Sequence, residues 1–118
     1  MLVLVLCAFG AAQNQPDALV ISPQKVAFGK QLVASESAPV EITVRNASNS
    51  AIHFNQIISS GIDFESRNNC GLELAAGAEC TVRVSFKPAI SGDRMGAIAI
   101  AASDSGSPHY VPLAGTGQ

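Results

Sequence analysis

The stretch CTVRVSFK, Cys80–Lys87, alternates between two kinds of side chain along its whole length. Every second residue from Cys80 to Phe86 is apolar, and the residues between them are polar or charged. Because successive side chains of a β-strand point to opposite faces of a sheet, the pattern predicts a strand with one buried face and one solvated face. Pro88 ends it, since proline cannot donate a hydrogen bond to a strand ladder.

The same kind of alternation recurs in both directions along the chain. In Pro39–Arg45, PVEITVR, the residues Val40, Ile42 and Val44 share one face. Other short apolar segments lie between clusters of Gly, Pro, Asn and Ser, without a long helical period, so the sequence predicts an all-β sandwich. The predicted strands are Leu19–Ile21, Lys25–Phe28, Pro39–Arg45, Ala51–Ile58, Ile62–Glu65, Cys80–Lys87, Arg94–Ala101 and His109–Leu113.

The connections between these segments carry their own signals. Ser22-Pro23 separates the first two strands, and a proline there suits an edge strand or a crossing between sheets. Asn46–Ser50, NASNS, is a turn of residues whose side chains bond their own backbone, which predicts that the strands on either side form a hairpin. Its first three residues also match a glycosylation acceptor, a match that occurs often by chance. Ser103–Pro108, SDSGSP, is a further turn.

Two segments near the end of the chain carry specific expectations. In Arg94–Ala101, Ile98 and Ile100 face one side, and we expect the small alanines to allow close approach by the other sheet. The segment Pro108–Leu113 contains Pro112, which favours a position at the edge of a sheet. Such an edge either accepts a partner's strand or is protected from aggregation by the proline.

Composition bounds the class of protein. The chain has 118 residues, of which 47% are hydrophobic and 14% charged, so it fits one folded domain and not a disordered chain. Its 7 basic and 9 acidic residues give a formal net charge of -2. Proteins that bind nucleic acids or anionic lipids usually carry a cluster of positive charges, so no nucleic-acid partner is expected.

An apolar run, Leu2–Ala12, opens the chain. It is shorter than the roughly 20 residues that a membrane-spanning helix needs, but it fits the core of a signal peptide. We therefore predict a cleaved leader over residues 1–12, a flexible segment over 13–18 and one domain over 19–118, secreted, periplasmic or on the cell surface, with no stable membrane span after cleavage. The alternative is a buried N-terminal strand or helix. Cys7 is expected to be an ordinary leader residue, because the bulky Leu6 precedes it where lipoprotein signals need a small residue.

Cys70 and Cys80 remain as a pair after removal of the leader, and such a pair in a secreted chain predicts one disulfide. With Cys80 on the inward face of its strand, the bond would tie the loop Gly71–Glu79 to the rim of the sandwich. Two alternatives remain, namely free thiols or a zinc site that also uses His53 and His109. The sequence lacks the close-spaced ligand pairs of structural zinc sites, so no metal and no other cofactor is expected.

Residues able to carry out catalysis are scarce, and their patterns favour structural roles. His53 and His109 lie in strand-like surroundings and are expected to be surface or half-buried structural residues. No G-x-S-x-G turn occurs, and Ser105-Gly106-Ser107 fits a turn instead. Gly115-Thr116-Gly117 lacks the rest of a phosphate-binding motif and is expected to terminate the last strand. The acidic residues expected on solvated faces and in turns are Asp63, Glu65, Glu73, Glu79, Asp93 and Asp104. The sequence therefore predicts no catalytic site and no enzyme.

Several short segments in fixed order resemble a known family. They are "ISPQKVAFG", "PVEITVRN", "NNC" followed nine residues later by "CTVRVSFKP", then "SGDRMGAIAI" and "VPLAGTG". Together they resemble the ASH-type (abnormal spindle/hydin) immunoglobulin-like domain, in the bacterial form called choice-of-anchor D, over Leu19–Gly117. The resemblance implies an all-β, immunoglobulin-like antiparallel β-sandwich of seven to eight strands, akin to major sperm protein and the pilus chaperones. It also implies scaffolding or protein contact, and no enzymatic activity.

The functional expectation is a non-catalytic, extracytoplasmic structural or protein-binding module, whose partner is another protein or an envelope component. One alternative is an intracellular scaffold domain of the same type with an uncleaved N-terminus. Another is an envelope ligand-binding protein or enzyme with a cryptic site. A pilus-type chaperone would need a second domain and a basic anchor, for which Arg83 or Lys87 are the candidates.

Overall fold

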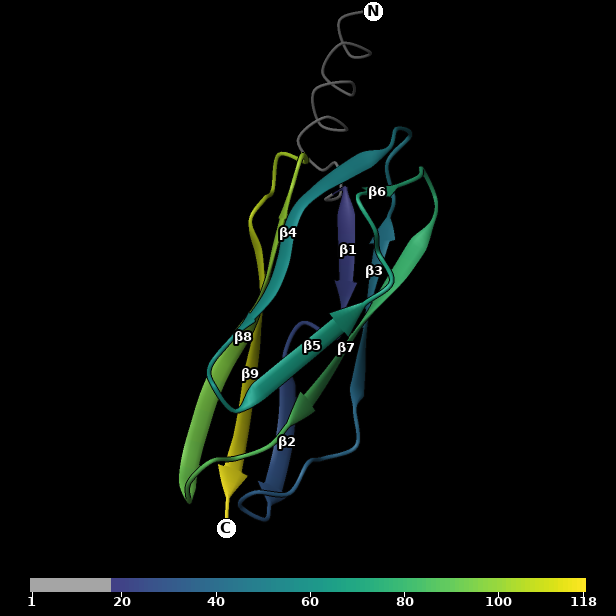
Figure 1. The fold of residues 1–118 in the computed structure, drawn as a ribbon. Coiled ribbons are helices and arrows are strands. Elements are labelled where there is room, and N and C mark those ends of the chain that lie inside the picture. Colours follow the sequence, from purple (N-terminus) through teal and green to yellow (C-terminus); the bar gives the residue numbers. More distant parts are fainter. Residues whose placement is uncertain (1–17) are drawn as a thin grey trace, which may run out of the picture.

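The computed structural model describes residues 18–118, which form two β-sheets packed as a sandwich (Figure 1). The predicted leader, Cys7 included, and most of the predicted flexible segment lie outside the described residues. Residues 18–118 contain no helix long and apolar enough to cross a membrane. The strands are β1 (Leu19–Ser22), β2 (Val26–Gln31), β3 (Val40–Asn46), β4 (Ile52–Ser60), β5 (Phe64–Asn68), β6 (Glu73–Leu74), β7 (Glu79–Phe86), β8 (Gly92–Ala102) and β9 (His109–Gly117).

The strands divide between sheet A, in the order β1-β3-β7-β5, and sheet B, in the order β2-β9-β8-β4-β6. This confirms the predicted two-sheet β-sandwich, with all eight predicted strands present. The described chain has nine strands rather than seven or eight, because β6 is only two residues long and shows no alternation in the sequence. One pair, β2 with β9, is parallel, whereas the prediction was antiparallel throughout.

The first two strands lie in different sheets, because the chain crosses over at Ser22-Pro23. The peptide bond between these two residues is cis. Before the crossing, β1 pairs with β3, and after it β2 pairs with β9. The predicted sheet crossing is therefore confirmed.

The predicted hairpin between the strands on either side of Asn46–Ser50 is wrong. β3 pairs with β1 and β7 in sheet A, while β4 pairs with β8 and β6 in sheet B. The turn is thus an arch from one sheet to the other, and the apolar residues on its two sides face each other across the core. Alternation shows which side chains are buried, but it does not show whether the next strand returns beside them or opposite them.

The core lies between the sheets and is built from the inward side chains of both. Val82, Val84 and Phe86 of β7 are all 0% exposed, as the alternation in CTVRVSFK predicted. The rings of Phe64 and Phe86 stack with their centroids 5.0 Å apart, and Phe28 lies 5.6 Å from Phe86. This aromatic cluster fills the half of the core nearest the C-terminus of the chain.

The last strand runs four residues beyond its predicted end, so Gly115-Thr116-Gly117 does not terminate it. Gly115 and Gly117 are buried within β9. A Cβ atom on Gly115 would lie 2.4 Å from Cε2 of Phe86, and one on Gly117 would lie 2.3 Å from the carbonyl oxygen of Ile90. Gly115 is therefore explained by close packing against a core side chain, and Gly117 by the close approach of the loop backbone before β8.

The alanines of the predicted strand Arg94–Ala101 do not face the other sheet, contrary to expectation. Ile98 and Ile100 point into the core and are 0% exposed. Ala97, Ala99 and Ala101 alternate with them and consequently point away from the core, to the outer side of sheet B. Both sets of side chains are apolar, and the larger ones are buried because they remove more apolar surface from water.

The predicted edge position of the Pro112 segment is confirmed locally, although β9 as a whole lies between β8 and β2 in sheet B. The pairing of β9 with β2 begins at Leu113, one residue after the proline. Residues 109–112 therefore pair with β8 alone and form a local edge on the other side. The proline is tolerated there because its missing N–H is not needed on that side.

Candidate interaction surface

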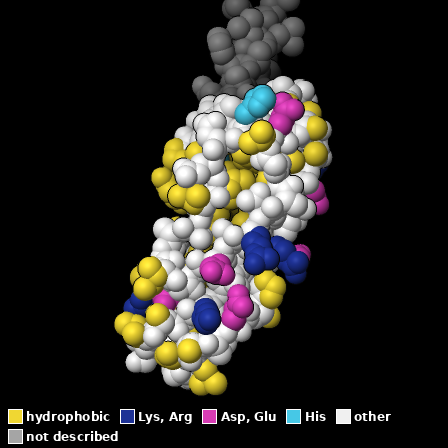
Figure 2. All heavy atoms as spheres, viewed as in Figure 1, with side chains coloured by type: hydrophobic (Ala, Val, Ile, Leu, Met, Phe, Trp, Pro, Cys, Tyr) yellow, Lys and Arg dark blue, Asp and Glu magenta, His cyan; other side chains and the backbone are white. Residues whose placement is uncertain are grey.

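The two outer faces of the sandwich differ sharply in charge. On sheet A, glutamates and arginines alternate with threonines and serines. Arg83 and Glu41 approach to 3.5 Å, with side chains 59% and 62% exposed. Figure 2 shows charged side chains gathered over the face that carries β5 and β7. The exposed charged residues that point outward from sheet A are Glu41, Arg45, Glu65, Arg67, Glu79 and Arg83.

The outer face of sheet B is uncharged over most of its length. Its strands contain no Asp, Glu, Lys or Arg from Met95 to Ala102, from Tyr110 to Gly117, or from Phe54 to Ser60. Apart from the exposed polar residues Asn55 and Gln56 of β4, the side chains that point outward there are small or apolar. We call this surface the alanine face, and it consists of Ala27, Ile58, Met95, Ala97, Ala99, Ala101, Tyr110, Pro112 and Ala114.

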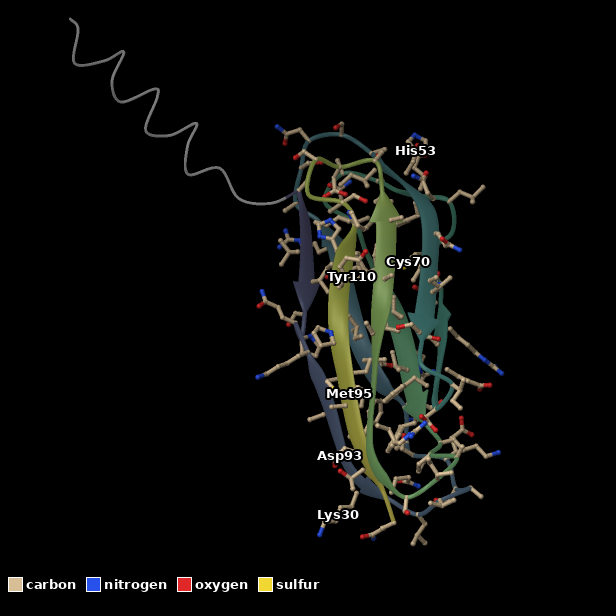
Figure 3. The ribbon with its side chains drawn as sticks, turned by 90° about the vertical axis from the view of Figure 1, so that its left-hand side faces the viewer. Lys30, His53, Cys70, Asp93, Met95 and Tyr110 are labelled. Atoms are coloured by element: carbon tan, nitrogen blue, oxygen red, sulfur yellow. A yellow bond between two sulfur atoms is a disulfide. The ribbon has the colours of Figure 1, made fainter. Side chains whose placement is uncertain are left out.

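Three larger side chains project from the alanine face above the small ones. Met95 is 78% exposed, Tyr110 63% and Ile58 45%. Figure 3 shows Met95 and Tyr110 on the side of the sheet that faces the viewer. Single exposed apolar residues are normal, but an uncharged and continuous apolar face is typical of a contact surface for another molecule.

Charged groups border the alanine face at its ends. At one end Lys30, Thr116 and Asp93 lie side by side on β2, β9 and β8. The hydroxyl of Thr116 donates to Oδ1 of Asp93 at 3.1 Å. At the other end His53 lies 3.2 Å from Glu73, and both side chains are more than half exposed. The apolar surface is thus bounded by polar groups, as protein interfaces commonly are.

Asp63 does not lie on a solvated face, contrary to expectation. Its side chain is 2% exposed, its Oδ2 accepts a 2.7 Å hydrogen bond from Arg94, and its Oδ1 accepts one of 2.8 Å from the backbone of Ala89. Burial acts to raise the pKa of Asp63, but the hydrogen bonds from Ala89 and Arg94 and the charge of Arg94 outweigh it, so that pKa lies below its ordinary value. The ion pair of Asp63 with Arg94 joins the loop after β4 to strand β8, so its role is structural.

Asp104 is the second acidic residue whose predicted exposure is wrong. Its side chain is 2% exposed and lies 2.7 Å from Nε2 of His109, whose side chain is 15% exposed. Ser107 in the same turn accepts a 2.8 Å hydrogen bond from the backbone of Ala102. The histidine, the aspartate and the serine are thus engaged in holding the turn between β8 and β9. His53 lies on the surface and His109 is half-buried, as expected.

Cys70 and Cys80 form the predicted disulfide, with their Cα atoms 5.0 Å apart. Both cysteines are 5% exposed, so Cys80 faces inward as its strand pattern indicated. The enclosed loop contributes β6, which pairs with the first residues of β4. Because both sulfurs are bonded to each other, they do not serve as zinc ligands. In the part of the chain that the structure describes, no three His, Cys, Asp or Glu residues group as a metal site.

The hollows in the described surface are open to solvent. The hollow on sheet A is lined by the oppositely charged residues Glu36, Glu65, Arg67 and Arg83, and Ser85 donates to Glu36 there at 2.8 Å. Arg83 lies on this charged face and Lys87 is exposed beyond the end of β7. The two candidate anchors for a pilus-type chaperone thus point outward, away from the core.

Sequence reasoning missed the structural role of Asn46, which it treated as the first residue of a turn. Asn46 is 0% exposed. Its Nδ2 donates to the carbonyl oxygens of Ser50 and Leu74, and its Oδ1 accepts from the amide and hydroxyl of Ser48. The side-chain amide that a glycan would modify is therefore used inside the protein. No local signal distinguishes such an asparagine from one in an exposed turn.

Comparisons with known proteins place this sandwich in a family. Residues 18–116 match the family model described as "HYDIN/CFA65/VesB-like, Ig-like domain". No curated protein sequence matches the chain.

Solved structures share the fold at low sequence identity. A Porphyromonas gingivalis W83 protein of unknown function has a TM-score of 0.71 and 12% identity, over 88% of this chain and 50% of that one. The ASH/PapD-like domain 7 of human CEP192 has a TM-score of 0.65 and 13% identity, over 89% of both chains. The secreted serine protease VesC of Vibrio cholerae has a TM-score of 0.66 and 21% identity, over 95% of this chain and 26% of the protease.

These likenesses confirm the predicted immunoglobulin-like, PapD-like fold, which a major sperm protein family member also shares. The chain spans half of the Porphyromonas protein and about a quarter of the Vibrio protease, at 50% and 26% of their lengths. Because the family model matches nearly all the described residues, this chain belongs to the family of HYDIN/CFA65/VesB-like immunoglobulin-like domains.

Proposed function

We propose that this domain is a non-catalytic structural or protein-binding module that acts outside the cytoplasm and contacts another protein through the alanine face. The observation that carries the proposal is the contrast between the two sheets. Six exposed charged side chains cover the outer side of sheet A. In sheet B, by contrast, no charged residue occurs in Phe54–Ser60 of β4, Met95–Ala102 of β8 or Tyr110–Gly117 of β9. Charged side chains on a free surface stay hydrated at no cost, whereas charges in a contact surface must lose their water at a cost in free energy. The absence of charge therefore favours a contact surface.

The extracytoplasmic part of the proposal is supported by the disulfide and by one likeness. A buried disulfide such as Cys70–Cys80 persists in oxidising compartments and is rare in the cytosol. The fold is also that of a domain in VesC, a secreted protease of Vibrio cholerae. The finer family assignment, the bacterial choice-of-anchor D form, belongs to the same proposal and is supported by the order of the motifs from "ISPQKVAFG" to "VPLAGTG".

The non-catalytic part is supported by what the reactive side chains already do. The two described cysteines are bonded to each other, His109 is paired with Asp104, and Asp63 is paired with Arg94. His53 lies on the surface beside Glu73 at the rim of the sandwich. Apart from His53, these reactive side chains are therefore engaged in contacts that hold the structure together.

Site-specific crosslinking tests the surface. A photoreactive amino acid replaces Ala99 on the alanine face in one variant and Thr43 on the outer face of sheet A in the other, in the organism that makes the protein. We expect discrete protein adducts from position 99 and none from position 43, and Ala101→Arg should abolish those from position 99. Equal adducts from both faces, or adducts that survive Ala101→Arg, would contradict the proposed surface.

Mass spectrometry of the protein from whole cells and culture medium tests the compartment. The expected result is a mature start near Gln13 together with an intact bond between Cys70 and Cys80. An uncleaved start with free thiols would instead favour the intracellular scaffold.

A further inference from the structure

The alanine face has a regular pattern, because paired residues on neighbouring strands point to the same side and form rows. The first row is Lys30, Thr116 and Asp93, on β2, β9 and β8 in that order. The second row is Ala27, Ala114 and Met95 on the same three strands. Farther along β9, Tyr110 pairs with Ala99, which pairs in turn with Ile58 of β4.

The first two rows are complementary to themselves about β9. A twofold axis that runs along β9, just above the face, exchanges β2 of one copy with β8 of the other, because β9 lies midway between them. In the first row this rotation sets Lys30 of each copy opposite Asp93 of the other. Two equivalent Lys30–Asp93 ion pairs result, one on each side of the axis.

The second row fits by shape under the same rotation. Met95, which is 78% exposed, comes to lie over Ala27 of the other copy, where the side chain is a single methyl group. Ala114 of β9 lies close to the axis and meets its own counterpart, which is again a small side chain. A projecting side chain thus meets a small one on each side of the axis, which is the arrangement that close packing requires.

The extent of the surface agrees with a weak contact. The rotation overlaps only β2, β9 and β8, because β2 is the edge of sheet B. Four rows on three strands cover at most roughly 400 Å² in each copy, from a strand spacing of about 4.8 Å and a rise of about 3.4 Å per residue. Two copies would then bury at most roughly 800 Å², in the range of weak or transient contacts, so we expect a dissociation constant between the micromolar and the millimolar range.

We propose that the part of the alanine face on β2, β9 and β8 is covered by a second copy of this chain, packed face to face about a twofold axis along β9. This inference rests on the proposed function and names the partner. The face carries no charge between its ends, so two copies meet without like-charge repulsion except where Lys30 and Asp93 compensate each other. An isologous contact of this kind needs one self-complementary patch, which the two rows supply.

A charge-exchange experiment on the purified domain tests the pairing. Sedimentation equilibrium is measured for the wild type, Lys30→Glu, Asp93→Lys and the double variant. Each single change sets like charges opposite each other and should raise the dissociation constant of the dimer about tenfold or more, while the double change should restore it. The control is Arg83→Glu on sheet A, which should leave the dimer unchanged. Circular dichroism checks that each variant is folded.

The position of the axis is tested with cysteine variants and a short bis-maleimide crosslinker. Ala114→Cys lies near the axis and should crosslink to its counterpart in the second copy. Ala27→Cys lies away from the axis and should not crosslink to itself, but it should crosslink when mixed with Met95→Cys. Thr43→Cys on sheet A is the negative control.

A protein that stays monomeric at millimolar concentration, or a dimer that tolerates both single charge changes, would overturn the inference. If a monomer still gives adducts with a different protein from position 99, the dimer is wrong and the protein-binding function stands. If the domain is monomeric and position 99 gives no adducts, both proposals fail.

Discussion

The side-chain nitrogen of Asn46 donates a 2.9 Å hydrogen bond to the carbonyl oxygen of Leu74, which lies 28 residues later in the chain. The backbone of Asn46 takes part as well, since its N–H donates to the carbonyl of Ala78 and its carbonyl accepts from the N–H of Gly77. One buried residue therefore ties the arch between the sheets to the loop that the disulfide encloses.

Asn46→Asp should be strongly destabilising, although the two side chains have nearly the same shape. It replaces a donor of two buried hydrogen bonds by a carboxylate that faces two carbonyl oxygens. The expected loss is about 3 kcal/mol in the free energy of unfolding, from unsatisfied acceptors and a buried charge. Urea denaturation at neutral pH measures it, with the exposed Asn49→Asp in the same turn as control. Equal stability of the two variants would show that the buried network contributes little.

Asp63→Asn should lower stability at neutral pH and lose that effect in acid. The pKa of Asp63 is lower in the folded state than in the unfolded chain, so the stabilisation is present above the unfolded pKa of about 3.9 and disappears as the pH falls through the folded value. At pH 7 the variant leaves Arg94 without its carboxylate, at a cost of about 2 kcal/mol. The difference between the urea midpoints of wild type and variant should be constant above about pH 5 and should shrink progressively as the pH falls below about 4. The exposed Glu65→Gln serves as control, and a constant difference at all pH values would refute the linkage.

Loss of the disulfide should destabilise the domain without unfolding it at low temperature. The bond closes a loop of 10 residues, which in the chain-entropy model is worth about 2 to 3 kcal/mol. The double variant Cys70→Ala/Cys80→Ala is compared with the wild type by thermal denaturation, with and without reductant. Reductant should lower the midpoint of the wild type to that of the variant and leave the variant unchanged. A wild type insensitive to reductant, with a midpoint equal to that of the variant, would mean that the bond adds no stability.

Gly115→Ala should be destabilising because the added methyl group has no room. Its Cβ would lie within 2.8 Å of three ring atoms of Phe86, which is itself fully buried. Such overpacking costs about 1 to 3 kcal/mol. Phe86→Leu makes space at the same place, so the double variant should be more stable than the sum of the two single losses predicts. Strict additivity in denaturation experiments would contradict a direct contact between the two sites.

Much of the fold could be predicted because strand alternation is a local property. In β7, the inward set from Cys80 to Phe86 is buried as the period of two indicates. The positions of eight strands, the crossing at Pro23 and the pairing of Cys70 with Cys80 follow from signals within a few residues of each site. Strand neighbours did not follow, as the arch at Asn46 and the parallel pairing of β9 with β2 show.

The candidate surface could not be predicted, for a physical reason that β8 makes plain. Both faces of Arg94–Ala101 are apolar near its centre, so the usual contrast between a buried and a solvated side is missing. Only the surroundings reveal that the isoleucines fill the core and that the alanines are left outside. Asp63 was misplaced for a similar reason, because its partner Arg94, 31 residues later, is brought to it by the fold.

The amino-acid sequence by itself determined the all-β class, the location of its strands and the disulfide, since each depends on period, turn residues or a single cysteine pair. The tertiary structure alone decided which strands lie side by side, which acidic residues are buried and which sheet carries an uncharged outer face. Those properties depend on contacts between residues far apart in the chain, such as Asp63 with Arg94 and Lys30 in one row with Asp93. A local pattern determines which side chains share a face of a strand. Only the assembled sandwich determines whether that face packs in the core or lies on the surface.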